Sequence, residues 1–477
     1  MSSGKHKSAD DRQGEYAKLK GGDGLARSSV EGSVMELERR GKHVRSGPSS
    51  TTSGGGTPGR KTDWYENRGL PITLKHFLDA YLKVKRNRGS HGVDRQSLMD
   101  FESQLVRNLY RLWNRVSSGS YFPPAVREKC IPKADGKVRK LGIPTVGDRI
   151  VQQVIKTYIE PRLEVEFSPS SWGYRPKRGV SGALNEVRLG VRKYAWVVDL
   201  DIAAFFDNVS HEKLGLALDR HVSEPWIRIL IYRWLTAPIL SEEGQLRYRQ
   251  GRGTPQGGVI SPLLANLYLH YALDRWLEAE HPQIKFVRYA DDVIVHCRSY
   301  DEAIHLRNEI ALRLRACELE LNLDKTQVVF CKRTNRRYKY KIVSFDFLSY
   351  TFKPRVKVRP DGMLFTGFDG GVSRKSEQAF CGKLRRSKFH LWTRRSIEQI
   401  ADYLNPIVSG WLNYFGKLNP YLLIRAMRTL NNRLVKWVCR RYKRYGKSAR
   451  KAARFLRKLA EERPKLFYHW SKGYHTA

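Results

Sequence analysis

The chain has 477 residues, and 88 Lys and Arg against 47 Asp and Glu give it a formal net charge of +41. This balance indicates nucleic acid or an anionic membrane surface as partner, and 24 Tyr, 18 Phe and 11 Trp favour nucleic acid because bases stack on such rings. Six scattered Cys without a C-x-x-C pair argue against a zinc ribbon and a disulfide framework. The sequence shows no long apolar run and no signal-peptide core, which predicts a cytoplasmic protein with no membrane partner.

The predicted elements begin after a polar N-terminal segment. Residues 1–61 are rich in Gly and Ser and bury too little apolar surface to fold, which predicts a mobile segment. Apolar residues at helical spacing predict helices over residues 74–87, 97–116 and 148–165. Before the last of these helices, an Ala-Asp-Gly sequence at residues 134–136 predicts a hairpin of two short strands.

Two strands with acidic residues follow. Residues 196–202 alternate between apolar and acidic side chains, so Asp199 and Asp201 share one face of the predicted strand. Residues 286–297 predict two apolar strands joined by a tight turn at Asp291-Asp292.

Helices dominate the remaining predictions. A Ser-Pro pair is typical of a helix start and predicts a helix over residues 261–277. Beyond Ser373 the chain becomes helical and strongly basic, with interleaved aromatic rings. We predict that most of these rings pack in a core and that most of the cations contact phosphate. His211 and His296 are expected to be core or edge residues with satisfied ring nitrogens.

The acidic residues suit one kind of chemistry. Phosphoryl transfer to a primer 3′-hydroxyl needs two divalent ions roughly 4 Å apart, held by carboxylates on rigid strands. An isolated Asp-Asp pair is usually a solvated turn. Here the pair lies between two apolar strands, and a second strand has its own alternating acids, so a metal site is favoured.

Several motifs carry a specific resemblance. Tyr289-Ala-Asp-Asp292 resembles the Tyr-x-Asp-Asp box of reverse transcriptases, residues 199–211 resemble their first palm motif, and residues 254–266 resemble the motif between the two. Residues 141–153 and 171–176 are similar to finger motifs of the group II intron branch, and residues 404–415 are similar to its maturase (thumb) domain. The motifs appear in the expected order from about Leu74 onward.

The resemblance implies an α+β fold: a right-hand polymerase with fingers and a palm of antiparallel sheet plus helices, and a helical thumb. We expect residues 62–185 to form an N-terminal extension and fingers, and residues 186–352 to form the palm. Residues 353–372 would be a connection. Residues 373–477 would be a basic helical thumb/maturase domain with a short C-terminal nucleic-acid-binding tail.

The resemblance also implies roles for individual residues. Two Mg²⁺ ions, with Mn²⁺ as a substitute, would be held by the carboxylates of Asp201, Asp291 and Asp292 and by the backbone carbonyl of Ile202. The implied nucleotide-binding residues are the 2′-hydroxyl-excluding Phe206, the triphosphate-gripping Lys133 and Arg139, the nucleotide-contacting Gln256, and Lys325 as a candidate general acid. The alternatives are core packing for Phe206 and solvated surface charge for the cations. Lys140 departs from the family's usual Pro, which puts the geometry of the finger hairpin in doubt.

The implied function is RNA-directed DNA polymerisation that copies intron RNA into cDNA, together with binding of intron RNA to assist its splicing and mobility, in a bacterial cytoplasm. Its partners would be an intron RNA template, a DNA primer or target and dNTPs, within a ribonucleoprotein containing group II intron RNA. No His/Asn/Cys cluster lies near the C-terminus, which predicts that the endonuclease domain of many group II intron proteins is missing. Two alternatives stay open: a free-standing relative in DNA repair or phage defence, and a non-catalytic RNA splicing factor. The intact acids count against the second alternative.

Overall fold

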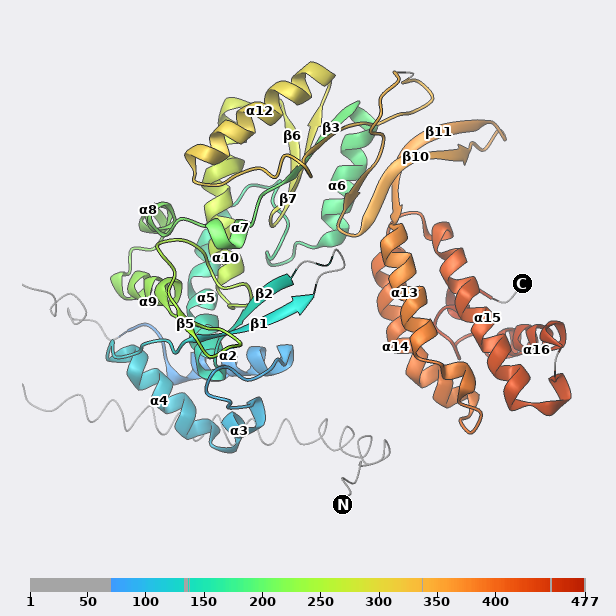
Figure 1. Cartoon of the computed structure of the whole chain (residues 1–477), viewed down its shortest axis with the longest axis horizontal. Coiled ribbons are helices and arrows are strands. Elements are labelled where there is room, and N and C mark those ends of the chain that lie inside the picture. Colours follow the sequence, from blue (N-terminus) through green and yellow to red (C-terminus); the bar gives the residue numbers. More distant parts are fainter. Residues whose placement is uncertain (1–69, 133–135, 137, 337, 447, 476–477) are drawn as a thin grey trace, which may run out of the picture. The chain divides into compact units, whose positions relative to one another are not determined.

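The computed structural model describes residues 70–132, 136, 138–336, 338–446 and 448–475 (Figure 1). The N-terminal segment predicted to be mobile and Lys133 lie outside these residues. The chain divides into two compact units. The first contains Met1–Ser168, Ala204–Arg275 and Leu314–Leu319, and the second contains Pro169–Ala203, Trp276–Arg313 and Glu320–Ala477.

The first unit is mainly helical around a small sheet. Its sheet has the order β2-β1-β4-β5, in which β1 pairs antiparallel with β2 and parallel with β4. The strands are β1 (Val126–Pro132), β2 (Val138–Ile143), β4 (Ile239–Leu240) and β5 (Leu246–Arg247). The helices are α2 (Leu74–Asn87), α3 (Leu98–Ser103), α4 (Leu105–Ser117), α5 (Val146–Glu166), α7 (Phe205–Asn208), α8 (His211–His221), α9 (Pro225–Thr236) and α10 (Ser261–Leu269). Helix α5 begins where the Thr145 hydroxyl accepts a hydrogen bond from the Asp148 amide, as expected of an N-cap.

Two predicted helices of this region differ from the observed ones. The stretch predicted as one helix over residues 97–116 is two helices, α3 and α4, because the chain leaves helical geometry at Gln104. The helix predicted over residues 261–277 is interrupted after α10 by a π-helical turn, His270–Asp274. Helix α10 is buried on nearly every side, so its sequence has little periodicity in which an inserted residue could be detected.

The second unit contains the antiparallel sheet that bears the acidic residues. Its strands have the order β6-β7-β3-β8, and all neighbours are antiparallel. They are β3 (Trp196–Asp201), β6 (Lys285–Tyr289), β7 (Asp292–Cys297) and β8 (Gln327–Phe330). Helix α6 (Val180–Lys193) packs on this sheet through Ala183, Leu184, Val187 and Val191, all of which are fully buried. Helices α11 (Arg275–Glu280) and α12 (Tyr300–Ala316) lie almost entirely in this unit.

A second sheet and a helical region complete this unit. Strands β9 (Phe345–Phe347), β10 (Tyr350–Val358) and β11 (Leu364–Val372) form a meander in the order β11-β10-β9. The helices are α13 (Arg374–Arg386), α14 (Ile397–Phe415), α15 (Ile424–Arg441) and α16 (Ala449–Glu462). One continuous apolar core runs from α6 and β3 through the meander to these helices. Among the described residues, no helix is long and apolar enough to cross a membrane.

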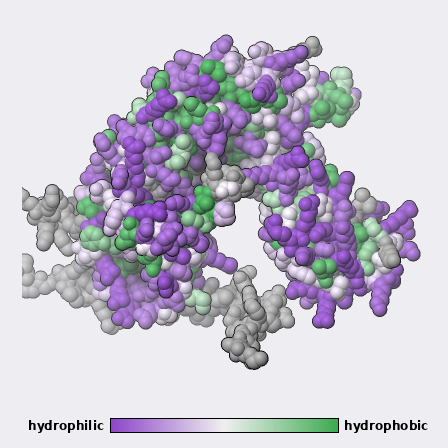
Figure 2. All heavy atoms as spheres, viewed as in Figure 1, coloured by the Kyte–Doolittle hydropathy of each residue, from purple (hydrophilic) through white to green (hydrophobic). Residues whose placement is uncertain are grey.

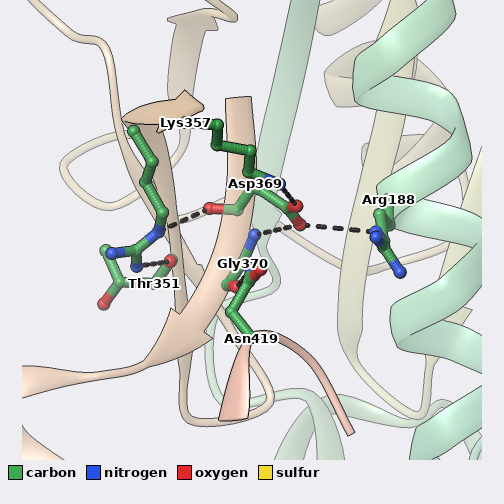
Figure 3. A network of polar contacts seen from close by, with 7 residues as sticks. Arg188, Thr351, Lys357, Asp369, Gly370 and Asn419 are labelled. Atoms are coloured by element: carbon green, nitrogen blue, oxygen red, sulfur yellow. Dashed lines mark hydrogen bonds and ion pairs between the residues drawn. The ribbon is translucent and has the colours of Figure 1, made fainter. Parts of the chain in front are cut away.

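A buried ionic network ties the meander to α6 (Figure 3). Asp369 on β11 is 1% exposed, and its carboxylate pairs with the Lys357 ammonium at 2.5 Å and with the Arg188 guanidinium of α6 at 3.5 Å. The Asn419 amide donates to the Gly370 carbonyl at 2.6 Å, which brings the segment after α14 to the same point. Such a network fixes the relative positions of three elements because a buried carboxylate left without partners is costly.

Candidate active site

The two acidic strands are direct neighbours, and their register brings the acids together. Strand β3 pairs with β7 so that Asp201 lies opposite Asp292. Directly opposed residues of an antiparallel pair have Cβ atoms about 5 Å apart, and like charges at that distance destabilise the pair. Folding therefore gives no reason for these two acids, whereas a cation between them does.

The turn that carries Asp291 has a strained backbone. Tyr289 pairs with Asp292, so the β6–β7 hairpin has a two-residue loop, and the first of these residues, Ala290, has φ 57°. A Cβ on Gly173 would lie 2.5 Å from the Ala290 nitrogen, so this glycine lets residues 170–173 pack directly against the turn. Buried Arg288 donates to the Ala290 carbonyl at 3.1 Å. Left-handed backbone at a non-glycine residue, held by its surroundings, is typical of functional sites.

Desolvation and mutual repulsion shift the acids in this cluster. Desolvation, followed by the charges of Asp291 and Asp201, raises the pKa of Asp292 to about 6. On the same face of β3, desolvation and three neighbouring carboxylates raise the pKa of Asp199 to about 8. Both acids therefore carry an electrostatic cost that a divalent cation would remove.

Lys325 lies beside this cluster. Its ammonium is 3.2 Å from Asp201 Oδ2. The segment before it is anchored to the end of β3, because the Asn322 amide donates to the Asp201 carbonyl at 2.8 Å and the Asp201 amide donates to the Thr326 hydroxyl at 3.3 Å. The structure thus brings Lys325 to the acids, and its role toward a triphosphate stays a prediction.

The residues present match a hard divalent cation in donor chemistry. Asp201, Asp291 and Asp292 supply carboxylate oxygens of the kind that Mg²⁺ prefers. Within the described part of the chain, however, no three His, Cys, Asp or Glu side chains converge as a metal cluster. Lys325 instead partly neutralises Asp201, so ligation by all three acids requires side-chain rearrangement. Ile202, the predicted carbonyl ligand, is 6% exposed and directly follows Asp201.

The predicted nucleotide-binding residues of the first unit form a hydrogen-bonded pair. Arg139 on β2 donates through Nε to Gln256 Oε1 at 2.8 Å, and the Gly142 amide donates to the Gln256 carbonyl at 2.8 Å. Gly257 has φ +125°, and a Cβ there would lie 2.5 Å from the Gly142 carbonyl oxygen. The Gln-Gly-Gly motif thus needs Gly257 in order to pack against the β1–β2 hairpin. The hydrogen bond to Gln256 orients the Arg139 guanidinium.

Phe206 lies in the same unit and is largely buried. Its side chain is 8% exposed and packs edge-to-face on Phe205 at 5.3 Å between ring centroids. Its carbonyl accepts a hydrogen bond from the Thr254 amide at 2.8 Å, which links α7 to the start of the Gln256 loop. This environment is compatible with both sugar selection and core packing.

A buried carboxyl in the finger motif was not predicted to have a role. Asp148 on α5 is 2% exposed, and its Oδ1 accepts hydrogen bonds from the Tyr121 hydroxyl and the Trp234 indole, each at 2.7 Å. Its Oδ2 accepts from Gln152 Nε2 at 2.8 Å. Burial raises its pKa to about 6 despite these three donors. Its sequence signal was an acid one helical turn before a glutamine.

Gln152 also accepts hydrogen bonds from the loop that contains Gln256. Its Oε1 accepts from the backbone amides of Val259 at 2.8 Å and Ile260 at 3.3 Å. A buried glutamine thus satisfies two amides just after the Gln-Gly-Gly motif. Asp148 and Gln152 together hold the loop that presents Gln256.

The C-terminal helices separate rings from cations as predicted. Trp437, Trp470 and Phe415 are buried in the core of the second unit. Hydrophilic side chains cover most of the visible face of these helices (Figure 2). The exposed cations include Lys383, Arg385, Arg386, Arg440 and Arg441.

Comparisons with known proteins find two families that match parts of this chain. The family described as reverse transcriptase (RNA-dependent DNA polymerase) matches residues 131–352, and the group II intron maturase-specific domain matches residues 378–455. The chain is 31% identical over 297 residues to Protein YkfC of Escherichia coli (strain K12), covering 54% of this chain and 77% of the relative. The chain belongs to the group II intron reverse transcriptase/maturase family.

Other members of the family match over shorter stretches. Group II intron-encoded protein LtrA of Lactococcus lactis subsp. cremoris is 32% identical over 204 residues, which cover 42% of this chain and 33% of LtrA. The chain thus spans about a third of LtrA's length. A solved telomerase from Candida albicans aligns with a TM-score of 0.40 at 13% identity, covering 77% of this chain and 70% of that chain. The family match confirms the predicted α+β polymerase fold class, and reverse transcriptases as a family use divalent metals.

Proposed function

We propose that this chain copies intron RNA into DNA with two Mg²⁺ ions and binds the same RNA to assist its splicing. The observation that carries the polymerase part is the β3–β7 register, which opposes Asp201 and Asp292 beside the Asp291 turn. When bound, the ions would lower the pKa of the primer 3′-hydroxyl and neutralise charge on the triphosphate. Asp201, Asp291, Asp292 and the carbonyl of Ile202 would hold them.

The remaining residues have supporting roles in this proposal. Lys325, which pairs with Asp201, would move to the triphosphate when metal replaces it beside that carboxylate. Arg139, oriented by Gln256, would contact the same phosphates with Lys133. The ring of Phe206 would exclude a ribose 2′-hydroxyl.

Primer extension by an acid-to-amide variant tests the polymerase part. Asp291→Asn should lower extension of a DNA primer on an RNA template by about 10³-fold or more, because an amide is a poor Mg²⁺ ligand. Asp402→Asn makes the same chemical change at an exposed position on α14 and should leave extension unchanged. Near-normal extension by folded Asp291→Asn protein would refute the metal assignment.

The splicing part is supported by the exposed cations of α13 and α15. Replacing them with Gln should weaken intron RNA binding and flatten its salt dependence, by about 0.7 to 0.9 in log K per decade of salt for each phosphate that is no longer neutralised. The substituted residues are Lys383, Arg385, Arg386, Arg440 and Arg441.

A charge-retaining control separates electrostatics from folding. Changing the four arginines of this set to Lys should keep the salt slope, since phosphate neutralisation needs only the charge. Asp291→Asn should still bind intron RNA and promote splicing. An unchanged slope in the Gln variant, or loss of RNA binding in Asp291→Asn, would contradict the splicing role and favour a free-standing polymerase.

A further inference from the structure

The sheet that bears the acids also lines a separate cavity. Helix α6, the edge strand β6 and residues 169–172 enclose about 530 Å³. Its innermost strand residue, His296, follows Asp292 on β7 by four residues, which is about 13 Å along a strand. α6 packs against both β6 and β7 at this position (Figure 1). None of the predicted polymerase residues lines this cavity.

Aromatic rings form one part of the cavity wall. Trp172 and Tyr194 both line it. Tyr194 stacks on His296 with ring centroids 5.9 Å apart and an interplanar angle of 24°. The exposed side chain of Leu189 adds apolar surface at the rim. Together these side chains make the cavity wall partly aromatic and apolar.

Three buried nitrogens in this wall lack partners. Both ring nitrogens of His296 and Nε1 of Trp172 are buried, and none of them has a hydrogen-bond partner among the described residues. The prediction that the ring nitrogens of His296 have hydrogen-bond partners is therefore wrong. Burial lowers the pKa of His296 to about 4, so its neutral ring offers one donor and one acceptor. Since an unsatisfied buried polar group destabilises the fold, a histidine here needs a reason beyond packing.

The backbone of α6 packs directly against the His296 ring. A Cβ on Gly190 of α6 would lie 2.2 Å from His296 Nε2, so the helix runs directly against the ring. The glycine is what permits this close packing, and both Gly190 and His296 line the cavity.

Cations surround the cavity entrance. Arg178, Lys193 and Lys285 line it together with one acid, Glu186. The Arg178 guanidinium also lies 4.8 Å from the Trp172 ring centroid. The local charge is thus positive, as required for a phosphate beside an aromatic site.

We propose that this cavity binds one unpaired nucleobase of an RNA strand, with the adjoining phosphate on Lys193 and Lys285. Recognition of single-stranded RNA uses this combination: bases splayed out of the strand stack on rings, hydrogen-bond at their edges and leave their phosphates on cations. His296 and Trp172, whose nitrogens are buried in the structure, would provide the edge contacts after a side-chain movement. The site is independent of the polymerase acids, and its failure would leave the proposed polymerase function untouched.

Photolabelling locates such a site directly. The full chain is irradiated with 8-azidoadenosine 5′-monophosphate in EDTA, which removes metal-dependent nucleotide binding, and labelled peptides are mapped. We expect label on the peptides that contain Trp172 or Tyr194. Single-stranded oligo(A) RNA should protect these peptides at lower concentrations than AMP does.

Two matched pairs of substitutions make the test specific. Lys193→Gln with Lys285→Gln should reduce labelling about fivefold or more, because the two cations that would hold the phosphate are removed. Arg192→Gln with Arg298→Gln removes the same charge from exposed neighbouring positions outside the cavity and should label like the wild type. His296→Phe should lose protection by RNA and, without its unpaired nitrogens, should melt at a higher temperature.

Other outcomes contradict the proposal. Label spread over the surface, or an equal loss in the Arg192/Arg298 control, would mean that general charge attracts the probe. Protection by AMP but not by RNA would show that the cavity binds a free nucleotide instead of a base within an RNA strand. Normal protection of His296→Phe by RNA would show that the ring nitrogens are not part of recognition.

Discussion

Substitutions of Asp148 and Gln152 test whether their hydrogen bonds hold the loop that contains Gln256. Asp148→Asn removes one acceptor, and the introduced amide then faces the Gln152 amide donor. Gln152 can relieve that clash only by rotating its amide, which turns its NH₂ toward the backbone amides of Val259 and Ile260. We therefore expect the defect to appear in this loop rather than at Asp148.

The magnitude follows from the two amides. Each buried N–H left without an acceptor costs about 1–3 kcal/mol, so their local opening free energy should fall by about 2–6 kcal/mol. Even the lower value corresponds to about 30-fold faster amide hydrogen exchange. Gln152→Glu alone should also destabilise, because it places a second buried carboxylate beside Asp148.

The double variant Asp148→Asn/Gln152→Glu should rescue both defects. The new carboxylate accepts from both loop amides and from the introduced asparagine, whose carbonyl still accepts from Tyr121 and Trp234. Hydrogen exchange at Val259 and Ile260 should return to within about 1 kcal/mol of the wild type, and the KM for dNTP should recover with it. If the two single defects simply add in the double variant, the hydrogen-bond chain does not hold the loop.

Three further substitutions test other parts of the molecule. Phe206→Ala should raise ribonucleotide relative to deoxynucleotide incorporation by about 10- to 100-fold, whereas an unchanged ratio would make Phe206 a packing residue. Gln256→Ala leaves the Arg139 guanidinium without its 2.8 Å acceptor and should raise the KM for dNTP about 3- to 10-fold, with little added effect of Arg139→Ala in the same chain; full additivity would mean that the two residues act separately. Asp369→Asn should destabilise the folded chain by about 3 kcal/mol in urea unfolding at pH 7. Its ion pairing with Lys357 and Arg188 lowers the pKa of Asp369, so the stabilisation is present above the ordinary Asp pKa and is lost as pH falls through the folded-state value. The difference from the wild type should therefore shrink at low pH, and a constant difference would exclude the carboxylate charge as its cause.

Periodicity predicted most elements because their burial patterns are simple. The alternation in residues 196–202 predicts strand β3, and the acid pair predicts the β6–β7 turn, each within two residues of the observed position. The break at Gln104 and the π-helical turn His270–Asp274 were not predicted. Local sequence does not mark either break, because Gln is a good helix former and the helix before His270 is buried on nearly every side. Tertiary packing therefore decides both.

The site was predictable to the extent that its chemistry is local in sequence. Asp201 and Asp292 could be paired because strand ends and turns are visible in the pattern. The Arg139–Gln256 hydrogen bond joins residues 117 positions apart and depends on Gly257 permitting close docking on β2. Partners of buried polar groups such as His296 depend on three-dimensional enclosure, which composition and spacing do not record.

The distribution of charge explains why such a basic chain needs its few clustered acids. A surface with a formal net charge of +41 attracts primer and template by phosphate neutralisation alone, without selecting any reacting atom. The opposed Asp201 and Asp292, by contrast, repel phosphate and each other, and Lys325 is held against Asp201. A site with that arrangement gains stability only from added positive charge. In the proposed function, the acids would therefore select divalent cations against the general field, and those cations would let one polyanion be brought to another at a single point.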